Sequence, residues 1–376
     1  MNDVENLGQV FTPPDIVLKM KQLCHNKGRI LEPSVGSGAF FDVLDSCVGI
    51  EIDKRLCKDN ILNIDFFDYP ITEKFDTIIG NPPYVRYQDI MPSTREKLSS
   101  SLFDKRSNLY LFFIEKCINH LNDKGELIFI VPRDFLKSTS SIKLNEFIFD
   151  SGTITDLIDL GDEKIFDGFS PNCIIFRFEK GNFSRITNGT KKFICSNGQL
   201  LFVNTLYTVP FKDIFFVKVG AVSGDDKIFM SDTYGNADFV CSSTFKDGKT
   251  RRMIYDNKIP YLEQFKGQLI TRKIKHFNEN TWWLWGRHCF KSDMKRIYVN
   301  CKTRHKRPFF THQCNNYDGS VLAIFPIRQN IDLYSVVDDL NDVDWSELGF
   351  VCDGRFIFSQ RSLENTILPE KFKEYI

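Results

Sequence analysis

Short apolar runs bounded by turn residues recur through the first half of the chain and predict buried strands. They lie at residues 29–31, 47–50, 60–64, 75–79, 125–132, 154–160 and 173–178. Apolar residues at helical spacing follow Pro13-Pro14, and another such run starts at Asn108, so helices are expected at both places. Strands that alternate with helices indicate an α/β layer fold with right-handed connections.

The expected strand at 75–79 leads into Asn81-Pro82-Pro83-Tyr84. Two consecutive prolines hold the backbone extended and remove its amide hydrogens. The Asn81 carboxamide, the Pro82 carbonyl and the Tyr84 ring therefore project from a strand end. Two hydrogen-bond acceptors beside a flat ring suit a planar amine, such as the exocyclic amino group of a base. The alternative is a tight turn with no chemical role.

A turn with two glycines, Gly36 and Gly38, follows the expected strand at 29–31 and leads toward a predicted helix from Phe40. Glycines at the carboxyl edge of a strand let the backbone approach a ligand closely. The turn is not a Walker loop, and it is not G-x-G-x-x-G because Phe41 occupies the third glycine position. It fits a nucleoside ligand that lacks a pyrophosphate.

Acidic residues stand at the ends of the next strands. Glu51 ends the second expected strand, which is where a ribose diol is held in nucleotide-binding folds. Asp65 ends the third, where its carboxylate can accept from an adenine amino group while Phe66 packs on the ring. Each carboxylate alone is an ordinary solvated group, but with Glu32 and Asn81 they form a set at neighbouring strand ends.

Composition changes the picture in the second half. A length of 376 residues allows one large or two medium domains, and Gly- and Asn-rich turns from about Phe183 suggest a linker region. The formal net charge is zero, yet residues 246–307 carry 17 Lys and Arg against 5 Asp and Glu. This basic segment is interleaved with three Trp, which predicts a nucleic-acid surface. The acidic stretch 332–353 is expected to be a solvated surface.

Other features exclude some classes of protein. The 11 cysteines are scattered without a C-x-x-C pair or a His/Cys cluster, as expected for reduced thiols in a cytoplasmic protein without a metal site. The N-terminus lacks the basic and apolar regions of a signal peptide. No apolar run reaches about 18 residues, so no membrane span is expected.

These motifs, in this order, resemble the γ-order S-adenosylmethionine-dependent DNA adenine-N6 methyltransferases, the TaqI-like N-P-P-Y family. The resemblance covers about residues 8–180 and rests on the motifs at 9–13, 31–38, 49–51, 65–66 and 81–84. It implies a Rossmann-like class I methyltransferase sheet followed by a second, C-terminal α+β DNA-recognition domain. The expected domains are a catalytic one at 1–182 and a target-recognition one at 183–376.

The resemblance also implies S-adenosyl-L-methionine as the cofactor. Thr12, Glu32 and the glycine turn would flank its methionine part, Glu51 its ribose, and Asp65 with Phe66 its adenine. The residues implied for cofactor binding are Thr12, Glu32, Ser34, Gly36, Gly38, Glu51, Ile52, Asp65, Phe66, Asn81 and Pro83.

In the family, a second aromatic residue clamps the flipped base from the other face. Phe166 stands at the matching offset before the strand at 173–178, and Phe169 is the competitor. The implied catalytic set is Asn81, Pro82, Tyr84 and Phe166.

The implied substrate is adenine N6 in double-stranded DNA, flipped out of the helix and methylated at a specific sequence. The expected enzyme acts as a monomer on DNA, as the modification enzyme of a restriction-modification system or without a cognate restriction endonuclease. The same N-P-P-Y motif also serves methyltransferases of RNA or of a protein glutamine. A specificity subunit with an inactive methyltransferase domain is the non-enzymatic alternative.

Overall fold

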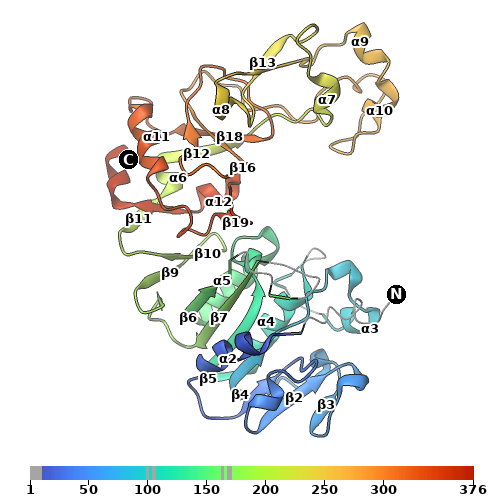
Figure 1. The fold of residues 1–376 in the computed structure, drawn as a ribbon, viewed down its shortest axis with the longest axis vertical. Helices are drawn as coiled ribbons and strands as arrows, with labels where there is room; N and C mark the ends of the chain where they lie inside the picture. Colours follow the sequence, from blue (N-terminus) through green and yellow to red (C-terminus); the bar gives the residue numbers. More distant parts are fainter. Residues whose placement is uncertain (1–10, 99–100, 104–106, 162–164, 167–171) are drawn as a thin grey trace. The chain divides into compact units, whose positions relative to one another are not determined.

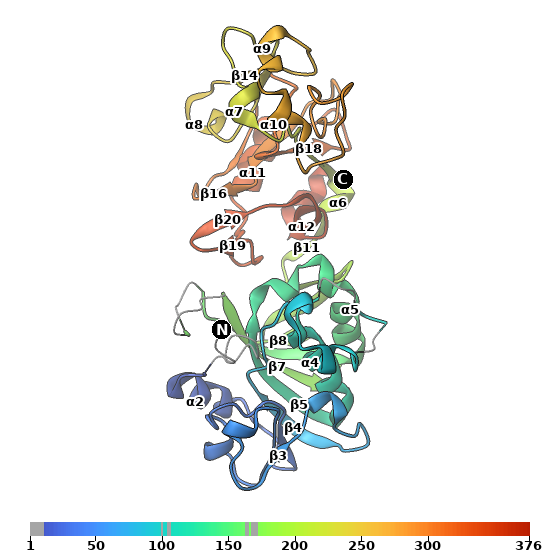
Figure 2. The ribbon, with the colours of Figure 1, turned by 90° about the vertical axis from the view of Figure 1, so that its right-hand side faces the viewer.

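The computed structural model describes residues 11–98, 101–103, 107–161, 165–166 and 172–376. The chain forms two compact units, Met1–Thr205 and Leu206–Ile376 (Figures 1 and 2).

Unit 1 is built around a seven-stranded sheet with the order β3-β2-β1-β4-β5-β7-β6. Its strands are β1 (Ile30–Glu32), β2 (Cys47–Glu51), β3 (Ile61–Asn63), β4 (Phe75–Gly80), β5 (Leu121–Pro132), β6 (Gly152–Asp159) and β7 (Cys173–Lys180). The first five strands in this order, β3, β2, β1, β4 and β5, pair in parallel, whereas β7 runs antiparallel to both β5 and β6. This mixed sheet is that of class I methyltransferases, as the sequence predicted.

Helices cover both faces of this sheet. Successive side chains of a strand point to opposite faces, so each strand contributes residues to both hydrophobic cores. Its helices are α2 (Pro14–Gln22), α3 (Pro92–Arg95), α4 (Leu109–His120) and α5 (Ile142–Ser151). Ile78 of β4 belongs to the cluster that includes residues of α4 and α5. Its neighbour Ile79 belongs to the cluster that includes α2. The carboxyl ends of β1, β2 and β4 remain open between these layers.

One predicted helix is wrong. The segment after the glycine turn forms only a short 3-10 turn, Phe41–Val43. The eight residues 39–46 must return the chain to the start of β2, and Ser46 takes a positive φ of 56° to do so. This connection is too short for a helix of several turns.

The predicted linker is also wrong. Residues from 186 onward form a three-stranded antiparallel sheet of β8 (Ile186–Thr187), β9 (Lys191–Ser196) and β10 (Gln199–Val203). Its two turns are Asn188-Gly189 and Asn197-Gly198, all four with positive φ, and Asn-Gly pairs of this kind are typical of tight hairpins.

The compact units therefore divide later than the expected domains. Phe193, Leu200 and Phe202 of the hairpin sheet belong to the core of unit 1, so unit 1 extends to Thr205. The functional division at 182/183 stays a prediction.

Unit 2 mixes small antiparallel sheets with short helices. The largest sheet has the order β12-β18-β15-β17, and the others pair β11 with β21, β13 with β14, and β20 with both β16 and β19. The strands are β11 (Tyr207–Pro210), β12 (Phe215–Val219), β13 (Ala237–Phe239), β14 (Arg251–Met253), β15 (Ile297–Asn300), β16 (Lys302–Thr303), β17 (Phe309–Phe310), β18 (Val321–Pro326), β19 (Val351–Cys352), β20 (Arg355–Ile357) and β21 (Ile367–Pro369). The helices are α6 (Phe211–Ile214), α7 (Asp226–Phe229), α8 (Thr244–Asp247), α9 (Pro260–Glu263), α10 (Lys266–Ile270), α11 (Leu333–Asn341) and α12 (Gln360–Glu364).

Two of the three Trp in the basic segment lie in the core of unit 2. Trp282 is 1% exposed and Trp285 is fully buried, where Trp285 stacks on Phe239 at 4.9 Å between ring centroids. The prediction that these rings form part of a nucleic-acid surface is therefore wrong. Their large apolar area fills a unit that has only short helices and strands.

Candidate active site

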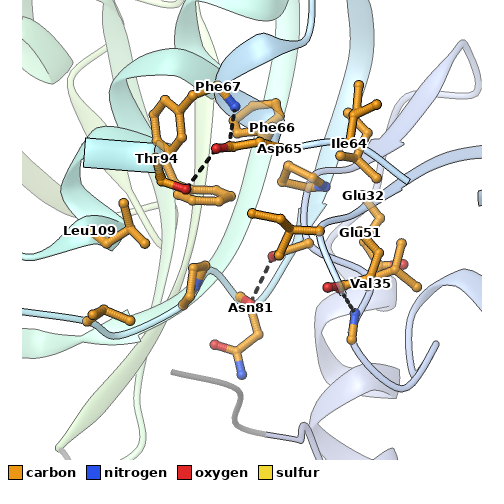
Figure 3. Close-up of a pocket in the computed structure, with 18 of the residues that line it drawn as sticks. Glu32, Val35, Glu51, Ile64, Asp65, Phe66, Phe67, Asn81, Thr94 and Leu109 are labelled. Atoms are coloured by element: carbon orange, nitrogen blue, oxygen red, sulfur yellow. Dashed lines mark hydrogen bonds between the residues drawn. The ribbon is translucent and has the colours of Figure 1, made fainter. Parts of the chain in front are cut away.

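An open cavity of about 920 Å³, its mouth included, lies at the carboxyl ends of β1, β2 and β4. It is lined by ten of the eleven residues predicted to hold the cofactor, namely Thr12, Glu32, Ser34, Gly36, Glu51, Ile52, Asp65, Phe66, Asn81 and Pro83. Gly38 is the exception. Figure 3 shows Asp65 and Thr94 at one end of the cavity and Asn81 at the other, with Glu32 and Glu51 along one side.

The glycine turn is held in place by β2. The Val35 amide donates to the Ile50 carbonyl at 3.0 Å, and the Gly36 amide donates to Glu51 Oε2 at 2.7 Å. Gly36 and Gly38 have positive φ values of 57° and 93°, where a side chain would be strained. The pattern of two glycines is thus required by the turn, although Gly38 itself is not among the lining residues.

Glu51 is oriented by two backbone donors. Its second oxygen, Oε1, accepts from the Asp53 amide at 2.7 Å, and the residue is 5% exposed. Each carboxylate oxygen has two lone-pair sites, so capacity remains for a diol on the cavity side. The predicted contact with ribose hydroxyls is compatible with this geometry.

Asp65 is more heavily engaged than the sequence suggested. Oδ1 accepts from the Phe67 amide at 2.9 Å. Oδ2 accepts from Thr94 Oγ1 at 2.8 Å and from Lys97 Nζ at 3.1 Å. Thr94 and Lys97 come from the segment beyond the Asn-Pro-Pro-Tyr stretch, and no sequence pattern singled them out.

Phe66 is mostly a core residue. It is 3% exposed and stacks on Phe113 of α4 with 5.0 Å between ring centroids. Its remaining surface lines the cavity together with residues that the sequence reasoning missed, namely Val85, Ile90, Met91, Thr94, Leu109 and Phe113. Asn108 caps α4 by accepting from the Tyr110 amide, and this places Leu109 and Phe113 at the cavity.

The buried carboxylate of Glu32 indicates whether the cavity suits a positively charged ligand. The residue is 1% exposed, and its Oε2 has no hydrogen-bond partner among the described residues. Burial raises the pKa of Glu32 well above the ordinary value, and the nearby Glu51 and Asp42 raise it further, although a backbone hydrogen bond at Phe41 opposes them. An unsatisfied buried carboxylate fits a cavity that receives an ammonium or sulfonium group.

Asn81 lies directly after β4 and is fixed from two sides. Its Nδ2 donates to Thr12 Oγ1 at 3.1 Å, and Ser34 Oγ donates to the Asn81 carbonyl at 3.2 Å. With the amide in this orientation, the Asn81 side-chain oxygen can act as an acceptor. Asn81 and Pro83 line the cavity, whereas Pro82 and Tyr84 are not among the lining residues.

Tyr84 is anchored through its hydroxyl group, which donates to the Ile130 carbonyl of β5 at 2.9 Å. Its ring makes edge contacts with Tyr110 at 5.9 Å and with Phe166 at 6.2 Å. The planes of Tyr84 and Phe166 are inclined by 63°, so the two rings meet but do not form a parallel slot for a base. Phe169, the competing aromatic, lies outside the described residues.

Within the described ranges, no three His, Cys, Asp or Glu side chains are grouped so as to hold a metal ion. No helix in the described part of the chain is long and apolar enough to cross a membrane.

The sheet of unit 1 is that of the class I methyltransferase fold, and its cavity suits the cofactor of that class, S-adenosyl-L-methionine. More particularly, residues 39–166 match the family model described as "Eco57I restriction-modification methylase". The resemblance predicted from the sequence motifs is therefore confirmed.

Curated relatives agree with this match. The chain is 33% identical over 189 residues to the type II methyltransferase M.HincII of Haemophilus influenzae, covering 47% of this chain and 38% of that protein. It is 32% identical over 199 residues to the type II methyltransferase M.TthHB8I of Thermus thermophilus, covering 47% of this chain and 46% of that protein. The chain thus spans less than half the length of these relatives.

Among solved structures, the type IIL restriction-modification enzyme MmeI, determined in complex with DNA, has a similar fold. The TM-score is 0.58 and the identity 13%, over 96% of this chain and 64% of that one.

Proposed function

We propose that this protein is a site-specific DNA methyltransferase that transfers a methyl group from S-adenosyl-L-methionine to N6 of an adenine flipped out of duplex DNA. The observation that carries the proposal is the placement of Asn81-Pro82-Pro83-Tyr84 directly after β4, beside a cavity lined by Glu32, Glu51 and Asp65. The similarity of residues 39–166 to restriction-modification methylases supports it. A role as the modification enzyme of a restriction-modification system is part of this proposal.

The residues around the cavity would bind the cofactor in an ordered way. Glu32 supplies a carboxylate oxygen for the ammonium end, the Gly36 turn gives backbone access, and Glu51 accepts from the ribose hydroxyls. When bound, the cofactor supplies an electrophilic methyl group on a sulfonium. Its adenine would lie among the apolar lining of Ile52 and Phe66, near Asp65.

The Asn81 stretch would then prepare the nucleophile. A base inside a duplex cannot reach the cavity, so it must be rotated out at a cost of a few kcal/mol. Stacking on the Tyr84 ring offsets part of this cost, because base–aromatic stacking is worth roughly 1–3 kcal/mol. Because Phe166 now touches Tyr84 edge-on, a base can be clamped between them only if these two rings separate.

The two acceptors act on the exocyclic amine. The Asn81 side-chain oxygen and the Pro82 carbonyl would each accept a hydrogen bond from one of its two N–H groups, which favours a tetrahedral nitrogen and localises the lone pair. The localised lone pair would then point toward the electrophilic methyl group that the bound cofactor would supply, and the methylated amine would release one proton to solvent. The contribution of the chain is positioning and electrostatic stabilisation, without a covalent intermediate.

The test is expression in a methylation-deficient host, followed by sequencing of the host DNA with detection of modified bases. We expect N6-methyladenine confined to one short sequence, and none with Asn81→Ala. That variant should bind S-adenosyl-L-methionine within about threefold of the wild type in calorimetry, because Asn81 contributes only part of the cavity wall. Activity of Asn81→Ala near the wild-type level would contradict its role. Unmodified host DNA together with intact cofactor binding would redirect the search to RNA or a protein glutamine.

A further inference from the structure

The cations of the basic segment differ in their surroundings, and two groups among them contrast. One group is used internally, because its side chains donate to backbone carbonyl groups. Arg272 donates to Leu269 O at 2.8 Å, and Arg287 donates to Gly220 O at 3.0 Å. Such cations hold loops together and are not available to a partner.

The other group gathers where two distant segments meet. Asn300 Nδ2 donates to the Ser242 carbonyl at 2.9 Å. The Phe245 ring lies 4.5 Å from the His305 ring, centroid to centroid, and His312 Nε2 lies 3.3 Å from the Gly248 carbonyl oxygen. The loop around α8 is therefore fixed against the chain that follows β15.

We call the cations of these segments and of the adjoining β20 the basic surface. It consists of Lys246, Lys249, Lys302, Arg304, Lys306 and Arg355, all exposed. Lys302 lies on β16, which pairs with β20, and Ile357 is its partner in the register. The same segments contain only two carboxylates, Asp247 and Asp353.

None of the six cations forms an ion pair with another described residue. The next residue along the chain behaves differently. Arg307 binds Asp338 at 2.8 Å and Asp342 at 2.6 Å, so the acidic helix α11 neutralises it. The boundary between paired and unpaired cations thus falls between Lys306 and Arg307, and the basic surface keeps its charge.

We propose that the basic surface contacts the phosphate backbone of duplex DNA. This inference rests on the proposed function and assigns it a particular surface of unit 2. Unpaired Lys and Arg on a surface fixed by internal contacts match a duplex that carries one negative charge per about 1.7 Å. Five of the six come from loops or strand ends. From there their long side chains can reach DNA phosphates, but no rigid element inserts them into a groove to read base edges. The contacts are therefore sequence-independent and position the duplex.

The test compares two triple variants of equal charge. One carries Lys302→Gln, Arg304→Gln and Lys306→Gln in the basic surface. The control carries Lys212→Gln, Lys227→Gln and Lys273→Gln, three exposed cations elsewhere in unit 2. The affinity for a short DNA duplex is measured by fluorescence anisotropy across a range of salt concentrations. Cofactor binding and thermal unfolding check that both variants are folded.

We expect the plot of log affinity against log salt to become shallower by about 0.9 for each lost phosphate contact, and so by roughly two to three in the first variant. The loss should be equal for duplexes with and without the methylated sequence. The control should change the slope by less than about one.

Three outcomes would overturn the proposal: equal slope changes in both variants, no change in the first, or a change seen with an RNA duplex but not with DNA. Failure of the proposed function is separable, because the wild-type protein would then leave host DNA unmethylated. A wild type that methylates DNA, combined with an unchanged slope in the first variant, would reject only the basic surface.

Discussion

Tyr84 combines a hydroxyl group that is bonded to β5 with a ring that faces Tyr110 and Phe166. Burial raises the pKa of Tyr84 well above its usual value, so the hydroxyl stays protonated and donates to the Ile130 carbonyl. The hydroxyl therefore serves the fold, whereas the ring is the part proposed to meet a base.

Substitutions separate these two roles. Tyr84→Phe keeps the ring and loses one hydrogen bond, so we expect about 1 kcal/mol less stability and methylation within a few-fold of the wild type. Tyr84→Ala also loses the stacking surface, and we expect kcat/KM to fall roughly ten- to hundredfold. Steady-state kinetics on duplex DNA measure both. Equal losses in the two variants would show that the hydroxyl is the functional part.

Glu32 is a second residue with a measurable signature. Its raised pKa, caused mainly by burial, means that the folded protein holds this proton more tightly than the unfolded chain does. Without ligand, the contribution of Glu32 to stability therefore falls as pH rises from the ordinary carboxyl range through the raised pKa. A bound ammonium group would offset this loss of stability, because it would pair with the ionised Glu32 carboxylate.

Glu32→Gln removes the titration. Without cofactor, we expect the variant to be more stable than the wild type above the raised pKa, with the difference growing by about 1.4 kcal/mol for each pH unit between the ordinary carboxyl pKa and the raised one. The difference should vanish at acidic pH, where Glu32 is protonated in both states. Urea unfolding at several pH values measures this, and calorimetry should show cofactor binding weakened about tenfold or more. If the free energy of unfolding of the two proteins changed in parallel with pH, Glu32 would not have the raised pKa assigned to it.

Among the elements, β4, β5 and β7 are joined through one buried carboxylate, that of Glu126 in β5, at the end of the sheet opposite the cavity. Glu126 is fully buried and binds Arg177 at 2.7 Å. It also accepts from Thr77 Oγ1 and from the amides of His25 and Asn26, each at 2.9 Å. These bonds tie the segment after α2 to three strands.

Glu126→Ala should cost about 3–5 kcal/mol, because it leaves the Arg177 guanidinium buried with less compensation. The matched control is Glu73→Ala, which breaks the exposed pair with Arg29 at 2.7 Å and should cost less than about 1 kcal/mol. Hydrogen exchange of the β5 and β7 amides measures the loss within unit 1. Similar effects of the two substitutions would show that burial does not strengthen the role of Glu126.

For the whole molecule, a basic residue in the sequence does not always place a positive charge on the surface. Arg272 was expected on a nucleic-acid surface, but its guanidinium donates to the carbonyls of Ser223, Leu269, Trp282 and Leu284. Its neighbour Lys273 is exposed.

Arg272→Ala should therefore lower the free energy of unfolding by at least ~2 kcal/mol, because several carbonyl groups lose their donor. Lys273→Ala should change it by no more than about 0.5 kcal/mol. Tryptophan fluorescence during urea unfolding reports unit 2, since all four Trp lie there. Equal stability of the two variants would place Arg272 back among the candidates for DNA contact.

The sequence by itself determined the strands of unit 1 and the position of its cavity. Buried strands need apolar residues, prolines and glycines mark their ends, and parallel strands bring Glu32, Glu51 and Asn81 to one edge. These are local rules with a fixed period, so they can be read along the chain.

Only the tertiary structure decided what surrounds each of these residues. Thr94 and Lys97 reach Asp65 across a connection that no periodicity describes, and the Asn-Gly turns could equally have belonged to a linker until Phe193 and its neighbours were seen in the core. Burial and partner choice depend on contacts between residues far apart in sequence. The same reason separates Arg272 from Arg304, two identical side chains in one basic segment: one is enclosed by carbonyl groups and the other is left exposed and charged.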